Sequence, residues 1–167
     1  MILTLKSTSM YEITECISNQ DFETARKVTQ AYMDWLNADL SYQNPDSEFE
    51  NFSEMYGPPD GTYLILLEDG TKPVGGAGLR RITGEICEIK RMYIEEGHRG
   101  KGYGKRLLLE LLRKANALGY EKVRLETVPR LEIANGLYTR TGFYIIDGYR
   151  NNPDDKVFAM EFDLSTF

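Results

Sequence analysis

The pattern of apolar and polar positions along the 167-residue chain predicts both strands and helices. Short apolar or alternating runs bounded by turn residues are typical of strands, whereas apolar residues spaced three and four apart are typical of helices. The predicted strands are 11–16, 62–68, 71–82, 85–94, 122–128, 143–147 and 156–164, and the predicted helices are 21–40, 46–56 and 102–118.

Two of these helices have an extended apolar face. We expect Asp21 to cap the start of helix 21–40 and Gly119 to follow the end of helix 102–118. Burial of each leucine should contribute about 1.5–3 kcal/mol, which would hold the second helix and the segment before it in place. The apolar faces comprise Ala25, Val28, Tyr32, Trp35, Leu36 and Leu40 in the first helix, and Leu108, Leu111, Leu112, Ala115 and Leu118 in the second.

The order of the segments predicts an α/β (α+β) fold with a mixed, mostly antiparallel central sheet flanked by helices. Asp69-Gly70 is a typical two-residue hairpin connection, and strand 85–94 should run antiparallel beyond that hairpin. No repeat or low-complexity linker interrupts the chain, and 167 residues suit one core better than two. We therefore predict a single domain over residues 1–167.

The formal net charge of −6 conceals an asymmetry between the two halves of the chain. Residues 1–70 hold 3 Lys or Arg against 13 Asp or Glu, a balance of −10, and residues 71–167 hold 17 against 13, a balance of +4. A basic second half suits a polyanionic cofactor, and an acidic first half suits a cationic acceptor. The alternative is that Asp34, Asp39, Asp46, Glu48, Glu50 and Glu54 only solvate helix surfaces.

Other classes of protein are disfavoured by the sequence. No run approaches the roughly 18 apolar residues that span a bilayer, and residues 1–10 lack the features of a signal peptide, so we expect a cytoplasmic protein without a membrane partner. Cys16 and Cys87 are expected to be reduced thiols, and with His98 as the single histidine we expect no metal site. No basic face with interleaved aromatic residues indicates a nucleic-acid partner.

The segment from Glu95 to Leu112 is the most informative part of the sequence. Gly100, Gly102 and Gly104 leave the backbone free to adopt φ > 0, so that consecutive N–H groups can converge on one anion. The leucine-rich helix that follows adds its N-terminal N–H groups and the positive end of its dipole. The segment therefore predicts a pyrophosphate site, the alternative being a glycine-rich turn before a surface helix.

The spacing decides which phosphate loop this is. A Walker loop needs Gly at 99 and Ser or Thr at 106, where the chain has Arg99 and Arg106, and the third glycine of a dinucleotide fingerprint is absent. The remaining pattern, Arg99-x-x-Gly102-x-Gly104, resembles the coenzyme A pyrophosphate loop of the GNAT superfamily of N-acetyltransferases. The resemblance allows Arg99 to contact phosphate or to stabilise the loop. The cofactor contacts that it implies are Arg99, Gly100, Lys101, Gly102, Tyr103, Gly104 and Lys105.

The flanking segments resemble the same family. Strand 85–94 looks like the family's fourth strand, which ends shortly before the loop, and 122–128 looks like its fifth. The resemblance covers about residues 85–147 and implies the GNAT acyl-CoA N-acyltransferase fold. Residues 133–143 resemble the signature Ala-x-x-Leu-Tyr-x-x-x-Gly-Phe, with Ala134, Leu137, Tyr138, Gly142 and Phe143 in place.

The resemblance implies direct transfer of the acetyl group from acetyl-CoA, a co-substrate, to an amine. A neutral amine must attack, the tetrahedral oxyanion must be stabilised, and the departing thiolate must be protonated. Tyr138, at the signature tyrosine, is the predicted general acid, and Glu88, on the fourth strand, is the predicted base. The alternatives are core packing for Tyr138 and an ion pair with Arg80, Arg81 or Lys90 for Glu88.

Strand alternation predicts the surroundings of Glu88. It should share one face with Lys90 and Met92, while Cys87 and Arg91 face the other way until any bulge resets the phase. Cys87 could in principle accept the acetyl group covalently. Because alternation turns Cys87 away from Glu88, we set that route aside.

The resemblance also implies main-chain contacts with the cofactor. The oxyanion donor should be an N–H of Met92, Tyr93 or Ile94, where the family has a bulge, and pantetheine should pair with this strand like an added strand. Many members place a cofactor-binding asparagine three residues before the signature alanine, whereas this chain has Leu131 there. Asn135 is kept as a candidate cofactor contact, an exposed helix asparagine being the alternative.

Three functions are compatible with the sequence. The first is acetyl transfer to a primary amine of a small, cationic acceptor, with the acidic first half as the acceptor wall. The second is protein or peptide N-acetylation, which needs an open groove. The third is non-catalytic acetyl-CoA binding, against which Tyr138 and Glu88 argue. The exposed edges of such a sheet either pair, as in a homodimer, or remain free, so the sequence leaves the oligomeric state open.

Overall fold

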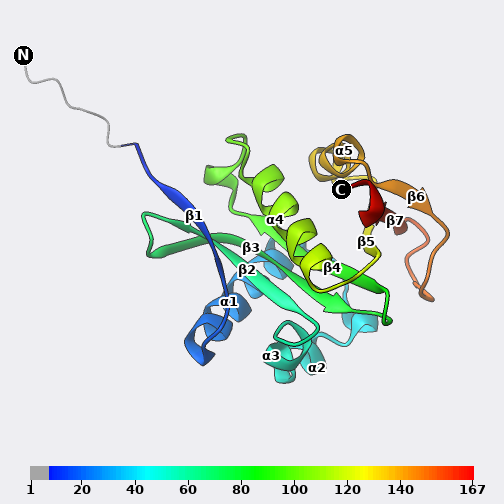
Figure 1. Ribbon diagram of the computed structural model, residues 1–167, viewed down its shortest axis with the longest axis horizontal. Helices are drawn as coiled ribbons and strands as arrows, with labels where there is room; N and C mark the ends of the chain where they lie inside the picture. The colour runs from blue at the N-terminus through cyan, green and yellow to red at the C-terminus, as the bar shows by residue number, and fades with distance from the viewer. Residues whose placement is uncertain (1–7) are drawn as a thin grey trace, which may run out of the picture.

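The computed structural model describes residues 8–167, which form a seven-stranded sheet (Figure 1). All neighbouring strands are antiparallel except β4 and β5, which are parallel, so the predicted mixed, mostly antiparallel sheet is confirmed. The strands are β1 (Tyr11–Glu15), β2 (Thr62–Glu68), β3 (Lys72–Arg81), β4 (Ile86–Ile94), β5 (Lys122–Thr127), β6 (Tyr144–Ile146) and β7 (Phe158–Asp163), in the spatial order β1-β2-β3-β4-β5-β7-β6.

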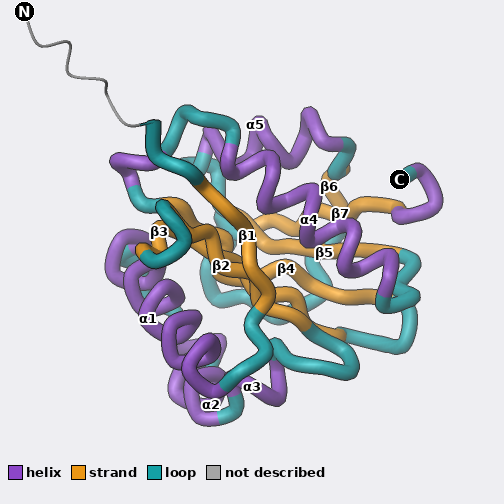
Figure 2. The backbone as a smooth tube through the Cα atoms, turned by 60° about the vertical axis from the view of Figure 1, so that its left-hand side comes forward, coloured by secondary structure: helices purple, strands orange, loops and turns teal. Residues whose placement is uncertain are grey.

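Helices cover both faces of this sheet (Figure 2). One face of the sheet, called the α1 face below, carries α1 (Asn19–Leu36), α2 (Pro45–Glu50) and α3 (Phe52–Met55). The opposite face of the sheet, called the α4 face, carries α4 (Tyr103–Ala117) and α5 (Glu132–Thr141). Short 3-10 turns are η1 (Ser41–Gln43), η2 (Glu96–His98) and η3 (Leu164–Thr166).

The hairpin between β2 and β3 forms at the predicted Asp69-Gly70 turn. Asp69 has φ 51° and Gly70 has φ 71°, both in the left-handed region. A two-residue turn of this kind matches the twist of the strands that it joins. Glu68 pairs with Lys72 next to the turn, and a register shift between Leu66 and Leu67 then places Thr62 opposite Leu79 at the far end of the hairpin.

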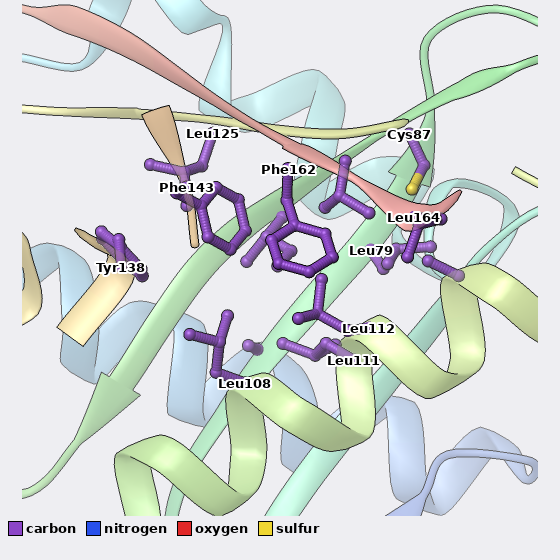
Figure 3. Close-up of a cluster of buried hydrophobic side chains, with 14 of the residues drawn as sticks. Leu79, Cys87, Leu108, Leu111, Leu112, Leu125, Tyr138, Phe143, Phe162 and Leu164 are labelled. Carbon is purple, nitrogen blue, oxygen red and sulfur yellow. The ribbon is translucent and has the colours of Figure 1, made fainter. Parts of the chain in front are cut away.

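The larger core lies on the α4 face, between α4, α5 and the sheet (Figure 3). Leu108, Leu111 and Leu112 project from α4 into it and are completely buried. Burial of this extent contributes about 1.5–3 kcal/mol for each leucine and fixes α4, together with the loop before it, against the strands. Other members of this core include Leu79, Cys87, Val123, Leu125, Tyr138, Phe143 and Phe162.

The smaller core lies on the α1 face and is rich in aromatic side chains. Successive residues of β2 point to opposite faces, so Leu64 belongs to the larger core while Tyr63 and Ile65 belong to the smaller one. The buried phenol of Tyr63 is hydrogen-bonded to Thr29 Oγ1 of α1 at 2.9 Å. This bond joins α1 to the sheet without leaving a buried polar group unpaired. The smaller core comprises Cys16, Phe22, Ala25, Phe52, Tyr56, Tyr63 and Ile65.

The boundaries of the first helix differ from the prediction. The N-cap is Ser18, whose Oγ accepts from the Asp21 N–H at 3.1 Å, while the Asp21 carboxylate accepts from the Ser18 N–H at 2.8 Å. The two residues form a reciprocal capping box, which is why Asp21 looked like the cap in the sequence. The helix ends before Asn37, at φ 48°, and Leu40 lies outside it. The predicted helix 46–56 is divided into α2 and α3 at Asn51.

Three of the sequence-based predictions concern the compartment, the number of domains and the metal content. No helix within residues 8–167 is long and apolar enough to cross a membrane. Residues 1–7, which belong to the segment read as lacking a signal peptide and to the predicted domain 1–167, lie outside the described residues. The compartment and the single-domain organisation stay predictions, as does the expectation of no metal.

The helix face of α4 yields a stability prediction. Leu111 is completely buried, whereas Leu118, predicted on the same face, is 39% exposed because α4 ends at Ala117. We expect Leu111→Ala to lower the free energy of unfolding by about 2–5 kcal/mol, since it removes buried methyl groups and leaves a cavity. Leu118→Ala should change it by less than about 1 kcal/mol. Urea denaturation measures both, and equal losses would contradict this assignment of the core.

Candidate active site

The pairing of the two parallel strands ends part-way along the sheet. β4 and β5 pair only at Ile86–Lys122, Cys87–Val123 and Glu88–Arg124. β4 nevertheless continues to Ile94 and β5 to Thr127. The main-chain groups of residues 89–94 that face β5 therefore have no ladder partner there, and they offer an edge to which an extended ligand can bind.

A β-bulge at Arg91 marks the point where the strands separate. Arg91 has φ 59°, and the register between β3 and β4 shifts between Gly76 and Gly78. A bulge adds one residue to one strand, so the side chains after it change face. The alternation predicted for Arg91 and Met92 is consequently wrong: Arg91 turns to the α1 face, and Met92 packs against the larger core.

A buried ion pair holds the bulge in this conformation. The side chains of Arg91 and Glu48 are 4% and 3% exposed, and Arg91 Nη2 lies 2.6 Å from Glu48 Oε2. Tyr56 donates its hydroxyl to Glu48 Oε1 at 2.6 Å. Burial alone would raise the pKa of Glu48, but the hydrogen bond and the charge of Arg91, together with the hydrogen bond from Tyr56, outweigh it and the pKa is lowered. The only inward-facing carboxylate of α2 is thus already neutralised by the sheet.

Tyr138 lies at the end of this divided region. It projects from α5 into the larger core (Figure 3) and is 7% exposed. Its hydroxyl is 3.9 Å from the sulfur of Met92. Burial, assisted by the nearby Tyr32 phenol, raises the pKa of Tyr138 above its ordinary value. The phenol is therefore protonated at physiological pH, as a proton donor must be.

The glycine-rich loop is held by its arginine. Arg99 Nε donates to the carbonyl of Ile94 at 2.6 Å, and its guanidinium lies 4.4 Å from the ring centroid of Trp35. Of the two roles that the sequence allows for Arg99, the structure shows stabilisation of the loop. The loop is thereby tied both to the end of β4 and to α1.

The backbone of the loop leads directly into α4. Gly100 and Gly102 have φ 76° and 84°, as predicted, but Gly104 does not have a positive φ because it lies within the first turn of α4. Gly102 is the N-cap, and no side chain of residues 8–167 caps this helix end. The first N–H groups of α4 are therefore available to an anion. Lys101 lies beside the ring of Tyr11, and Arg106 lies beside the ring of Tyr103. The two tyrosine rings stack, with their centroids 4.1 Å apart.

Glu88, the predicted base, is clamped by three side chains. Its side chain is 1% exposed. The carboxylate accepts hydrogen bonds from Arg80 Nε at 2.9 Å and from the Tyr149 hydroxyl at 2.8 Å. It accepts two more, each of 2.5 Å, from the guanidinium of Arg150. Burial opposes ionisation, but Arg150, together with Lys90 and Arg80, lowers the pKa of Glu88 to about 2. Glu88 is thus a very weak base in this arrangement.

A second carboxylate lies on the same face, where the strands have separated. Glu126 of β5 has a buried Oε2 with no hydrogen-bond partner among residues 8–167. The nearest cation to this oxygen is Arg150 Nη1, at 3.6 Å. Burial raises the pKa of Glu126, the charge of Arg150 opposes the shift, and the charge of Glu88 adds to it. Its unpaired oxygen and raised pKa make Glu126 a better proton acceptor than Glu88.

The family comparison agrees with this architecture. The sequence profile of the acetyltransferase (GNAT) family matches residues 29–143. The chain belongs to the GNAT family of acetyltransferases. A curated relative, an uncharacterised N-acetyltransferase from Schizosaccharomyces pombe, is 31% identical over 147 residues, which cover 87% of this chain and 90% of the relative.

Solved GNAT structures share the fold. An acetyltransferase from Staphylococcus aureus Mu50 has a TM-score of 0.78 at 19% identity, covering 93% of this chain and 99% of its own. A GNAT acetyltransferase from Elizabethkingia anophelis, solved with acetyl-CoA bound, has a TM-score of 0.65 at 18% identity, covering 92% and 97%. The predicted GNAT fold and N-acetyltransferase class are therefore confirmed.

Other predicted site residues of this GNAT protein have structural partners. Asn135 Oδ1 accepts from Thr127 Oγ1 at 2.6 Å, and Asn135 Nδ2 donates to the Val128 carbonyl at 2.9 Å. Its amide thus fixes the connection from β5 to α5, and its contact with the cofactor stays a prediction. Cys87 lies in the larger core, where burial raises the pKa of its thiol.

Sequence reasoning missed three residues of the site. Glu126 alternates with the buried Val123 and Leu125, so its period-two position could have placed it on the polar face of β5. Tyr149 and Arg150 lie in the long connection between β6 and β7, which has no periodic pattern. Only the folded chain brings that connection over Glu88.

The clamp around Glu88 predicts how stability depends on pH. Its pKa is about 2 in the folded protein and about 4.5 as an ordinary carboxyl, so its contribution is complete above pH 4.5 and is lost as the pH falls towards 2. We expect the urea midpoint of the wild type to fall over this window more steeply than that of Glu88→Gln. The exposed Glu54→Gln is the control and should keep the wild-type slope. Equal slopes for wild type and Glu88→Gln would contradict this account.

Proposed function

We propose that residues 1–167, as one domain, transfer the acetyl group of acetyl-CoA to a primary amine of a small acceptor by direct nucleophilic attack. The observation that carries the proposal is the unpaired edge of β4 beyond Glu88, with the Tyr138 phenol at its far end. A thioester placed along this edge lies between a proton donor and the charged α1 face. Membership of the GNAT family supports this chemistry.

The cofactor would lie along β4 and reach the start of α4. Its pantetheine arm would pair with the main chain of Met92, Tyr93 and Ile94, one of whose N–H groups would stabilise the oxyanion. Its pyrophosphate would accept hydrogen bonds from the main-chain N–H groups of residues 100–104, next to the side chains of Lys101 and Lys105. The acetyl-CoA-bound Elizabethkingia protein, which shares the fold, is consistent with this placement.

Tyr138 would protonate the departing thiolate. Its hydroxyl lies beside Met92, within the stretch of β4 expected to bind the thioester. The raised pKa of the phenol keeps its proton available until sulfur develops negative charge.

We propose that Glu126, rather than the predicted Glu88, receives the amine proton. Glu126 has a free oxygen and a raised pKa, whereas Glu88 has a pKa of about 2 and is fully hydrogen-bonded. A base works best when its pKa is close to the operating pH. Glu88 would then serve to position Arg80 and Arg150.

A small acceptor is favoured over a peptide by the covering of this site. Tyr149 and Arg150, from the connection between β6 and β7, lie over Glu88, which leaves it 1% exposed. A peptide would need an open groove at that position. The sequence-based expectation of a cationic acceptor rested on acidic residues that prove to be exposed or, in the case of Glu48, ion-paired. We therefore leave the cationic charge out of the proposal.

The role of Tyr138 is tested by removing its hydroxyl. Tyr138→Phe should lower kcat by about 10- to 1000-fold with little change in KM, because packing is retained and only the proton donor is lost. Release of coenzyme A from acetyl-CoA, measured over a panel of amines, amino acids and short peptides, provides the rates. A wild-type rate in Tyr138→Phe would make it a packing residue, and no amine-dependent release by the wild type would favour a non-catalytic acetyl-CoA binder.

The two carboxylates are separated by their pH profiles. The base must be deprotonated, so kcat/KM should rise with pH through a pKa above the ordinary 4.5 if Glu126 is the base. We expect Glu126→Gln to remove this acidic limb and Glu88→Gln to retain it, at a lower rate. The opposite pattern would restore Glu88 as the base.

A further inference from the structure

The charges around the proposed acceptor position do not cancel. The acceptor cluster, defined as Arg80, Glu88, Lys90, Glu126 and Arg150, lies on the α1 face where β4 and β5 separate. It contains three basic side chains and two carboxylates, and the adjoining Arg91 and Glu48 neutralise each other. The cluster therefore has one excess positive charge.

Lys90 is the cation of this cluster that makes no direct ion pair with a carboxylate of residues 8–167. Its side chain is half-buried, and its Nζ contacts the neutral Gln43 Oε1 at 3.4 Å. Within residues 8–167, no carboxylate oxygen lies within 4.0 Å of this nitrogen. Burial and the neighbouring Arg91 lower the pKa of Lys90 to about 8, which leaves it mostly charged at neutral pH. A half-buried ammonium group in this state is stabilised by any anion that binds beside it.

Arg80 supplies further donors next to Lys90. It lies opposite Glu88 in the register of β3 and β4, and Lys90 lies opposite Gly78, so the two cations are diagonal neighbours across the strands. Arg80 uses only Nε for Glu88, and its Nη1 and Nη2 make no hydrogen bond to residues 8–167. Arg80 also lines a shallow surface cavity of about 320 Å³ together with Glu54, Asp60 and Arg81, so its side chain is accessible from the surface, although Lys90 does not line this cavity.

We infer that the acetyl acceptor is an amine that also carries a carboxylate, bound by Lys90 and the terminal nitrogens of Arg80. The inference rests on the proposed function, because it assigns the substrate class of the same site. The single excess charge matches a monoanion, whereas a phosphate dianion would leave the cluster negative. Lys90 is two residues before Met92, on the other side of the bulge, which places the two residues at most about 7 Å apart along the strand, so the carboxylate and the reacting amine belong to one small molecule.

This arrangement orients both ends of the acceptor. With its carboxylate on Lys90 and Arg80, the acceptor presents its ammonium group to Glu126, which removes one proton before attack. The neutral nitrogen then bonds to the acetyl carbon, the carbon–sulfur bond breaks, and Tyr138 protonates the thiolate. The nitrogen loses its extra proton to become the amide, and this proton restores the Tyr138 phenol. A polyamine, in contrast, would bring a second positive charge beside Lys90.

The test compares acceptors that differ only in this charge. For a series of amino acids and their carboxamides, coenzyme A release gives kcat/KM for each pair. We expect the wild type to prefer the free acid at least about tenfold, although the amine of the carboxamide is less basic and more often neutral. Preference for the carboxamides or for uncharged amines overturns the inference and leaves the proposed function standing.

Substitutions of Lys90 test whether this side chain causes the preference for free acids over carboxamides. Lys90→Gln should raise KM for the free acids about tenfold or more and change turnover of the carboxamides little, and Lys90→Arg should restore the preference. The matched control is Arg81→Gln, which removes a charge from the exposed neighbour of Arg80 and should retain it. Carboxamide turnover reports whether each variant is folded. A preference that survives Lys90→Gln overturns this site, and a wild type that binds coenzyme A but acetylates neither series overturns the proposed function and the inference with it.

Discussion

The active region depends on one strained residue, Arg91, and on the buried carboxylate that holds it. A non-glycine residue at φ 59° is unfavourable, and it persists only when its surroundings compensate. Here the compensation is the ion pair with Glu48, whose loss from either side would cost about 3–5 kcal/mol because the remaining charge would stay buried. The bulge ends regular pairing, turns Met92 towards Tyr138 and leaves the edge of β4 open. Helix α2 thus controls the shape of a strand from which it is distant in sequence.

The buried charges around this bulge divide the work between structure and chemistry. Glu48 and Glu88 are satisfied by arginines and tyrosines, which keeps both ionised and makes both poor bases. Glu126, on the strand that has separated, keeps an unpaired oxygen, and Lys90 keeps an unpaired charge among the described residues. In the proposed complex, the reacting amine would bind the unpaired oxygen of Glu126, and the anionic substituent of the same molecule would bind Lys90. Native proteins otherwise rarely leave such groups buried and unpaired.

The loop shows a comparable division. Arg99 donates to the Ile94 carbonyl and lies against the Trp35 ring, so it stabilises the backbone of the loop. The main-chain N–H groups at the start of α4, which the buried leucines hold against the sheet, are available to an anion. This design places the rigid element, α4, behind the flexible glycines. It also ties the loop to the same strand that carries the bulge, so that both ends of an extended cofactor would be positioned by β4.

The sequence by itself determined the elements, the mixed sheet, the glycine loop and the GNAT family, because periodicity, turn chemistry and motif spacing are local properties. It also placed Tyr138 and the positive φ of Gly100 and Gly102. The faces of Arg91 and Met92 were wrong, since a bulge reverses alternation and has no local signature in this strand. Arg80 was among the partners that the sequence suggested for Glu88, whereas its contacts with Tyr149 and Arg150 and the exposure of Glu126 were decided by the tertiary structure alone. Arg150 and Tyr149 reach Glu88 from more than 60 residues away, and only packing of the whole chain brings those charges together to set the pKa values of the site.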